Sequence, residues 1–348
     1  MGKRPGRHSE RRMHRPAARR YDSAISRLGD RIISCHQQGM SHQARLTDGP
    51  ARAIWSHPFR ISNPVTHPLP NHLRVYLINL DRAEERLRRM EEKCAKAGLS
   101  FERVAATDGA TLAFPHADVS ARAYRYLHGR RIIPAEVGCY FSHVECARRL
   151  LQGDAEHALV LEDDVAFSQD FAAVLRDALN ADEDWDILRL STMNTGPKFR
   201  FRDLPNGRSL AIALTREKGA GAYVINRRAA AWIVEDLMPM RLSYDIAFDL
   251  EYLDGLRAAF VDPPPVDQRD EAKSQIQNNI RAYKYPRSRY LTVLPYRAWI
   301  ETARLVMRSL CYLMLVFQHQ PRLAAIRLVP ILAATVLGID EVFDHLRD

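Results

Sequence analysis

Three consecutive carboxylates, Glu162-Asp163-Asp164, are the residues whose types and spacing most directly suggest chemistry. Like charges a few ångströms apart raise one another's pKa unless a cation compensates them. A divalent metal is such a cation, because hard carboxylate oxygens suit Mg²⁺ or Mn²⁺ and either ion can also hold phosphate oxygens. The triplet therefore indicates either a metal site or, as the structural alternative, a solvated acidic turn after an edge strand.

The segment before the triplet bears on that choice. Residues 158–161 form a continuous apolar run, which predicts a strand buried on both faces. Ligands of open α/β sheets bind in the crevice at the carboxyl ends of strands, and the triplet stands at that end. Position and chemistry thus agree on a site for a cation and a phosphate group.

The elements ahead of this strand predict a parallel sheet. Residues 74–80 form a β-rich run and residues 101–106 a second strand. Between them, residues 82–97 are expected to form a helix, with Asp81 as its N-cap and Gly98 after its end. A strand, a helix and a strand within about 35 residues make the βαβ unit of a parallel sheet.

Later segments continue the alternation of strands and helices. A helix that begins at Pro134 carries Ser142 and His143 beside its apolar face. The further elements expected are strands at 185–190, 211–214 and 222–225, helices at 170–179 and 227–238, and polar or irregular stretches at 110–131 and 191–210.

Charge is unevenly distributed over the 348 residues. Residues 1–70 hold 13 Lys/Arg and 4 Asp/Glu, a net charge of +9, whereas residues 71–348 hold 38 of each. The 46% of hydrophobic residues excludes a wholly disordered or collagenous chain. We expect residues 1–70 to be a basic, largely disordered tail, either an electrostatic tether or a plain extension. A neutral body makes nucleic acid an unlikely partner, since such binders carry a basic face.

The five cysteines predict no disulfide framework. Their number is odd, and the sequence offers no C-x-x-C pair and no Cys/His cluster with metal-ligand spacing. We interpret them as reduced thiols in a reducing compartment. Residues 1–30 lack the apolar core of a secretory signal, so a cytoplasmic location is expected.

The C-terminal part has a different character. Residues 305–317 and 323–337 are apolar stretches, each interrupted before it reaches the length of a membrane span. They predict either an amphipathic hairpin on an anionic membrane surface or a helical pair packed on the body. We therefore expect a catalytic domain at 71–285 and a helical extension at 286–348, peripheral on the cytoplasmic face of the inner membrane.

Five segments, taken in order, resemble glycosyltransferase family 25, which contains bacterial lipooligosaccharide galactosyltransferases and is related to procollagen galactosyltransferases. No P-loop, dinucleotide-binding glycine motif or serine nucleophile elbow competes with this resemblance. The segments are 75–86, the strand and turn at 101–109, the helix at 136–143 that ends in Ser142-His143, the strand at 158–165 that carries the triplet, and the strand at 221–225.

The resemblance implies a GT-A-like, Rossmann-related mixed sheet flanked by helices. It implies an inverting transfer of a hexose from a nucleotide sugar, often UDP-galactose, with Mn²⁺ or Mg²⁺ as the divalent metal. The acceptor would be a lipopolysaccharide, a lipooligosaccharide or a related surface glycan. A binding module for nucleotide sugars or glycans that has lost catalysis is the alternative, although the intact triplet argues against decay.

The resemblance also implies roles for individual residues. Asp164 would be the first metal ligand, with Glu162 sharing the ion. Asp245 would be the catalytic base, and Asp249 is the second candidate because the proline usual before the acid is missing here. The residues expected around the donor are Asn79, Asp81, Arg82, Arg86, Thr107, Asp108, Ser142, His143, Glu162 and Asp163. For Arg82 and Arg86 the alternative is ion pairing along an exposed helix face.

Overall fold

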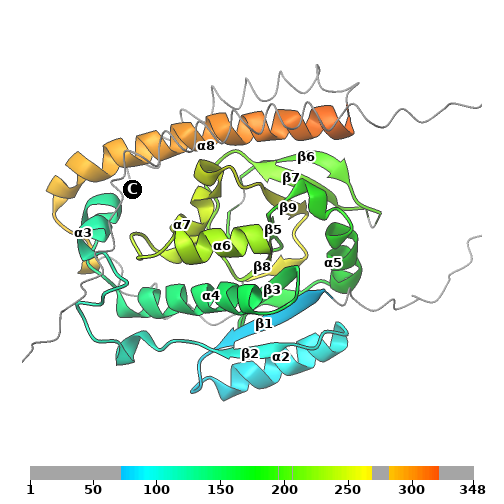
Figure 1. The fold of residues 1–348 in the computed structure, drawn as a ribbon, viewed down its shortest axis with the longest axis horizontal. Helices are drawn as coiled ribbons and strands as arrows, with labels where there is room; N and C mark the ends of the chain where they lie inside the picture. The colour runs from blue at the N-terminus through cyan, green and yellow to red at the C-terminus, as the bar shows by residue number, and fades with distance from the viewer. Residues whose placement is uncertain (1–71, 195, 206, 269–281, 321–348) are drawn as a thin grey trace, which may run out of the picture. The chain divides into compact units, whose positions relative to one another are not determined.

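The computed structural model describes residues 72–194, 196–205, 207–268 and 282–320, so the tail predicted at 1–70 lies outside the described residues. An eight-stranded mixed sheet with the order β2-β1-β3-β8-β5-β9-β7-β6 forms its centre (Figure 1). The strands are β1 (Leu73–Asn79), β2 (Glu102–Ala105), β3 (His157–Glu162), β5 (Ile187–Arg189), β6 (Lys198–Asp203), β7 (Ser209–Ala213), β8 (Ala222–Asn226) and β9 (Ala258–Asp262). The short strands β4 (Ala166–Phe167) and β10 (Val266–Asp267) pair separately.

Helices flank this sheet, as the sequence predicts. They are α2 (Glu84–Lys96), α3 (Ala121–Ala123), α4 (Pro134–Gln152), α5 (Phe171–Leu179), α6 (Arg227–Glu235), α7 (Tyr244–Ala247) and α8 (Tyr290–His319). Shorter 3₁₀ or π turns are η1 (Gly109–Thr111), η2 (Tyr124–His128), η3 (Asp182–Asp184), η4 (Phe248–Asp254) and η6 (Arg287–Arg289). The α/β class with a mixed sheet is therefore confirmed.

The first βαβ unit is present, but its helix begins differently from the prediction. Strand β1 is parallel to both β2 and β3. Helix α2 starts at Glu84 after Ala83, and no side chain caps it. The prediction of Asp81 as the N-cap is wrong, because the Asp81 carboxylate instead accepts a hydrogen bond from Arg103 at 2.5 Å. The Gly98 prediction is confirmed, since Gly98 ends the helix with a φ of +68°.

Each central strand contributes to two hydrophobic cores because its side chains alternate between the faces of the sheet. On β1, Leu77 packs in one core with Met90 of α2, and Ile78 packs in the other core with Val137 of α4. The first core also takes in α5 and the end of α8, and the second takes in α6 and α7. Strand β3, at residues 158–161, is buried on both faces as predicted.

The edge of the sheet departs from the prediction. Residues 191–210 were expected to be polar and irregular, yet they contain β6, which pairs antiparallel with β7. Strand β6 has one exposed face, so aromatic and charged residues alternate along residues 198–203. That alternation is the pattern of a half-buried strand. The segment is not predicted as a strand from its composition, because most of its residues are charged.

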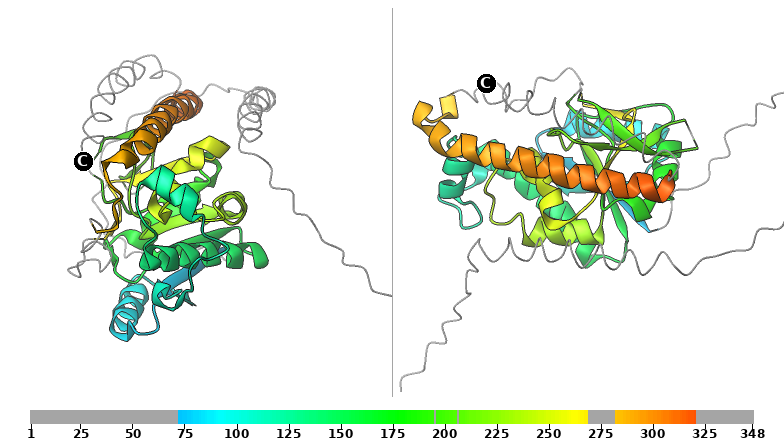
Figure 2. Two further views of the ribbon diagram at one scale, coloured as in Figure 1. Left: turned by 90° about the vertical axis from the view of Figure 1, so that its left-hand side faces the viewer. Right: turned by 90° about the horizontal axis from the view of Figure 1, so that it is seen from above.

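Helix α8 packs on the body of the described chain and runs along the edge formed by β6 and β7 (Figure 1). Arg304 and Arg308 in its middle are buried, and Tyr252 of η4 donates to the Ile300 carbonyl at 2.8 Å. Seen from above, no other described element lies over its outer side (Figure 2). Within the described part of the chain, we find no helix with the length and apolar content that a membrane crossing needs.

Candidate active site

The predicted site lies where β1 and β3 end side by side. Ile78 of β1 is paired with Glu162, the last residue of β3, and Asn79 is the last residue of β1. The triplet follows at the carboxyl edge of the parallel part of the sheet. Asn79, Glu162, Asp163 and Asp164 are thus brought together as the sequence indicates.

Asp163 is held by the first βα unit. Asn79 donates to one of its carboxylate oxygens at 2.7 Å, and Arg86 of α2 donates to the other at 2.9 Å. The Arg86 guanidinium therefore reaches across to the triplet instead of pairing along its own helix. Both oxygens of Asp163 have partners within the protein, which makes it the least available of the three carboxylates.

The carboxylate of Asp164 is only partly paired within the described part of the protein. Its nearest cation is Arg86, at 3.9 Å from Oδ2, and its Oδ1 is buried without a hydrogen-bond partner among the described residues. Burial, followed by the negative charges of Glu162 and Asp163, raises the pKa of Asp164 to about 6. An added cation would relieve both causes, because it would ligate the orphaned oxygen and offset the neighbouring charges.

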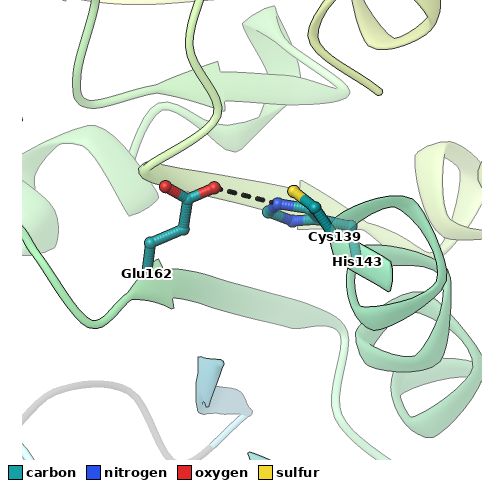
Figure 3. Close-up of side chains that lie close together, drawn as sticks. All are labelled: Cys139, His143 and Glu162. Atoms are coloured by element: carbon teal, nitrogen blue, oxygen red, sulfur yellow. Dashed lines mark hydrogen bonds and ion pairs between the residues drawn. The ribbon is translucent and has the colours of Figure 1, made fainter. Parts of the chain in front are cut away.

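Glu162 is fixed from two sides. His143 of α4 lies with its Nε2 at 3.2 Å from Glu162 Oε1, and Gln268 donates to Oε2 at 3.1 Å. Gly221 allows the approach of Gln268, since a Cβ on that glycine would lie 2.1 Å from the Gln268 amide nitrogen. Figure 3 shows the Glu162 carboxylate facing the His143 ring.

The His143 ring is locked in place by two tyrosines. Its Nδ1 lies 3.0 Å from the Tyr223 hydroxyl, which lies 3.1 Å from the hydroxyl of Tyr244. The Tyr244 ring stacks on the imidazole with centroids 4.2 Å apart and planes within 3°. His143 is 1% exposed, so its only functional edge is the one that faces Glu162.

Cys139 stands beside these groups on the same helix. The ligand atoms of Cys139, His143 and Glu162 all lie within 4.8 Å of one another (Figure 3). The spacing of cysteines and histidines in the sequence predicts no metal-ligand cluster, yet the fold brings these three potential ligands together. Residues four apart on a helix share a face, and the third member comes from β3, the next strand along the chain.

Ser142 joins α4 to the loop after β2. Its hydroxyl donates to the Gly138 carbonyl at 2.8 Å and accepts from the Thr107 backbone N–H at 2.9 Å. Gly138 permits this contact, because a Cβ there would lie 2.3 Å from the Thr107 carbonyl oxygen. The geometry gives Ser142 a positioning role at this end of the sheet.

The other predicted donor residues surround the end of β1 and β2. Arg82 pairs with Asp108, whose carboxylate also accepts from the Ala110 backbone N–H at 3.0 Å. That backbone hydrogen bond, together with Arg82, lowers the pKa of Asp108 despite an opposing effect of desolvation. Arg103, which the sequence analysis did not single out, donates to Asn79 Oδ1 at 3.1 Å and connects it to the exposed Asp81.

Asp249, the second candidate base, lies in a different environment. It is 0% exposed, and its carboxylate is 2.8 Å from Arg308 and 3.1 Å from Arg304. Burial favours the neutral acid, but Arg308, Arg304 and Arg189 together lower the pKa of Asp249. A carboxylate held ionised inside the core cannot reach an acceptor hydroxyl, so we remove Asp249 from the candidate bases.

Asp245 remains the candidate base. It lies on α7 directly after Tyr244, whose ring covers His143. It is partly exposed, and no residue in the described ranges forms a hydrogen bond or ion pair with its carboxylate. A carboxylate that is partly solvated and has no partner among the described residues can accept a proton, which Asp249 cannot.

A cavity of about 430 Å³ opens beside this site and not within it. It lies between the end of β2 and the outer face of α4, and none of the triplet lines it. Thr107 and Phe141 contribute to its wall, and His116 packs on Phe141 with ring centroids 5.1 Å apart. The candidate site is therefore defined by its charges and by orphaned oxygens, and the cavity is its neighbour.

Residues 72–248, just over half of the chain, match the family described as glycosyltransferase family 25 (LPS biosynthesis protein). The chain belongs to glycosyltransferase family 25. The matched range includes all five segments that carry the resemblance, and also Asp245.

Relatives of this family 25 chain are found in animals. It is 35% identical over 107 residues to a glycosyltransferase 25 family member of Drosophila pseudoobscura pseudoobscura, covering 28% of this chain and 17% of that protein. It is 27% identical over 172 residues to procollagen galactosyltransferase 1-A of Xenopus laevis, covering 45% of this chain and 28% of that protein. The matched segment thus spans less than a third of either relative.

Among solved structures, the family 25 chain is similar to the crystal structure of S. aureus TarS 1-349 in complex with UDP-GlcNAc. The identity is 15% and the TM-score 0.37, over 71% of this chain and 72% of that chain.

Three residues of the candidate site are not predicted from the sequence, namely Cys139, Tyr223 and Gln268. The four-residue spacing of Cys139 and His143 is a usable signal for the first. The tyrosine lies in a strand segment that the family resemblance already includes. Gln268 has no local signal, because only its place after strand β10 and the space beside Gly221 bring it to Glu162.

Proposed function

We propose that this family 25 chain is a nucleotide-sugar-dependent hexosyltransferase. The donor would be UDP-galactose, and the transfer would proceed with inversion onto a lipopolysaccharide, a lipooligosaccharide or a related surface glycan. The observation that carries the proposal is the orphaned oxygen of Asp164 within a triplet that Arg86 alone compensates among the described arginines and lysines. The galactosyltransferase name of the Xenopus relative and the LPS description of the family support the choice of sugar and acceptor.

Asp164 and Glu162 would hold the divalent cation. Their hard oxygens suit Mn²⁺ or Mg²⁺, and the raised pKa of Asp164 reports a site where a positive charge is missing. When bound, such a cation stabilises the negative charge that develops on a leaving diphosphate. Arg86 would add a fixed positive charge at the same end of the sheet.

Asp245 would act as the base. An inverting transfer needs one carboxylate to take the proton of the acceptor hydroxyl while its oxygen attacks the anomeric carbon. The Asp245 carboxylate has no protein partner among the described residues and lies next to Tyr244, on the helix that covers His143. Asp245→Asn should abolish transfer and leave donor affinity near that of the wild type; full activity in this variant would exclude Asp245.

Calorimetry with the full chain tests the donor site. UDP, UDP-galactose, UDP-glucose and UDP-N-acetylglucosamine are titrated with Mn²⁺ and with EDTA. We expect metal-dependent binding that Asp164→Asn loses and that Asp154→Asn keeps, since Asp154 is 90% exposed and lies outside the site. Binding of no UDP sugar by the wild type would refute the proposed donor, and equal binding in EDTA would refute the metal.

We also propose that α8 lies on an anionic membrane surface, in the cytoplasm and on the inner membrane. Five large apolar side chains are between 38% and 54% exposed along this helix, with spacings of three, four or seven residues that place them on one face. These residues are Trp299, Val306, Leu310, Met314 and Phe317. The net charge of +9 in residues 1–70 adds an attraction to anionic lipid.

Vesicle flotation tests the membrane proposal. The full chain should float with vesicles that contain anionic lipid and float less with neutral ones. Val306→Glu combined with Leu310→Glu should reduce flotation, whereas Ala95→Glu on the exposed side of α2 should not. Undiminished flotation of the double variant would assign binding to other residues, and no flotation of the wild type would reject the proposal.

A further inference from the structure

Cys139, His143 and Glu162 form a donor set that differs chemically from the carboxylate triplet. The triplet offers hard oxygens, whereas this set offers a thiol, an imidazole and one carboxylate. Mg²⁺ and Mn²⁺ favour oxygen ligands, while sulfur and imidazole nitrogen favour Zn²⁺ and related borderline cations. Glu162 belongs to both sets, so the two kinds of cation meet at one residue.

We propose that Cys139, His143 and Glu162 bind a cation of the Zn²⁺ class, and that this cation withdraws Glu162 from the donor site. The proposed binding is inferred only from the positions of these three side chains. Its inhibitory consequence rests on the proposed function, because it matters only if Glu162 serves the donor.

The distances suit such an ion. His143 Nε2 lies 3.2 Å from Glu162 Oε1, and two ligands of a tetrahedral zinc ion, each about 2.0–2.1 Å from the metal, are about 3.3 Å apart. The Cys139 sulfur already lies within 4.8 Å of both atoms. Figure 3 shows the sulfur and the imidazole projecting from the same side of α4 toward Glu162.

The surroundings support His143 as a ligand. A metal-bound histidine usually donates its other ring N–H to a fixed partner, which holds the ring orientation. The Tyr223 hydroxyl lies 3.0 Å from Nδ1 and can accept that hydrogen bond while it donates to Tyr244. The imidazole can therefore present the lone pair of Nε2 to a cation without any movement of the ring.

Charge also favours occupation. A thiolate, a carboxylate and a divalent cation sum to zero, with the thiol proton released to solvent. Burial first, and then the negative charges of Glu162, Asp245, Glu136 and Asp164, disfavour a thiolate at Cys139 that no cation accompanies. The same carboxylates attract a cation to the thiol.

Cadmium is the probe that tests the binding, because Cd²⁺ has the same preference and its bond to a thiolate absorbs in the ultraviolet. Titration of the full-length wild type should give a charge-transfer band that saturates near one equivalent. Cys139→Ser should lose the band and weaken binding at least about tenfold. Cys311→Ser, a matched change on α8, should keep it. Absence of the band in the wild type, or its persistence in Cys139→Ser, would overturn the proposal.

A second measurement needs no variant. Alkylation of Cys139 in the wild type, followed by mass spectrometry, should slow at least about tenfold in Zn²⁺ and not in Mg²⁺. An unchanged rate in Zn²⁺ would also overturn the proposal.

The same samples separate this proposal from the proposed function. UDP binding in Mn²⁺ should weaken when Zn²⁺ is added to the wild type and not when it is added to Cys139→Ser. A cadmium band without any UDP binding would leave the cation site standing and remove the donor site. UDP binding without a cadmium band would do the reverse.

Discussion

Two groups of acids lie inside this chain, and they differ in the number of cations that face them. In the triplet, Asp163 and Asp164 share Arg86, and one oxygen of Asp164 has no partner among the described residues. We call the second group the α8 cluster. In it, Asp249 and Glu251 face three arginines, which are Arg189, Arg304 and Arg308. In the first group one arginine faces two carboxylates, and in the second three arginines face two carboxylates.

The two groups contain the same residue types, but the pKa values of their buried aspartates are shifted in opposite directions. In the α8 cluster the arginines hold the pKa of Asp249 below its usual value although burial opposes this. In the triplet, burial and like charges raise the pKa of Asp164 to about 6. A buried acid that the protein compensates holds elements together, whereas one that it leaves uncompensated is suited to a cation from outside.

The largest effect should come from breaking the α8 cluster. Arg308→Met removes the shared partner of Asp249 and Glu251 and leaves buried carboxylates short of positive charge. We expect a loss of about 3–5 kcal/mol in the free energy of unfolding, measured by urea titration. Arg88→Met is the matched control, because Arg88 is 58% exposed. The urea midpoint of this variant should equal that of the wild type. A small loss for Arg308→Met would mean that α8 does not depend on the cluster.

The next effect should appear in the triplet as a loss of cation affinity. Asp164→Asn removes the carboxylate whose oxygen has no protein partner, and we expect Mn²⁺ to bind at least about a hundredfold more weakly. Calorimetry with Mn²⁺ and UDP measures this. Asp163→Asn should have a smaller effect, since Asn79 and Arg86 already occupy both oxygens of that carboxylate. The opposite order would make Asp163 the principal ligand.

The sequence predicts the position of the triplet, at the end of β3 and beside the end of β1, because the signals for these elements are local. A continuous apolar run predicts β3, a β-rich segment predicts β1, and a glycine predicts the end of α2. The carboxyl ends of parallel strands lie at the same edge of a sheet. The α8 cluster is different. Arg308 lies 57 and 59 residues from Glu251 and Asp249, in a stretch where arginines look like interruptions of an apolar helix. Only the folded chain shows that these arginines point inward.

The same reasoning explains the two candidate bases. Asp245 and Asp249 lie four residues apart in one polar stretch, so composition does not distinguish them as candidate bases. Asp249 lies in η4 and pairs with Arg308 of α8, and Asp245 follows the tyrosine that covers His143. The choice between them depends on a helix that begins about 40 residues later, which no local pattern predicts.

A smaller effect should appear in the pH dependence of the metal-free protein. The pKa of Asp164 is raised in the fold, so the folded state binds a proton that the unfolded chain has already lost between about pH 4 and pH 6. Stability should therefore fall as pH rises through this window, by about 1–3 kcal/mol. Asp164→Asn should remove this part of the slope, and Mn²⁺ affinity should drop as pH falls below 6. Urea titrations at both ends of the window measure it, and an unchanged slope in Asp164→Asn would show that Asp164 is not its source.

The smallest effect should come from the exposed face of α2, which has three ion pairs of 3.0 Å or shorter. Glu85 lies 2.8 Å from Arg88 and 3.0 Å from Arg89, and Arg88 lies 2.6 Å from Glu92. Water solvates all four side chains, so neither pairing nor loss of a partner strands a charge. Glu85→Ala should leave the urea midpoint unchanged at moderate salt. A shift comparable to that of Arg308→Met would mean that short distances alone, and not burial with or without compensation, distinguish the groups of this chain.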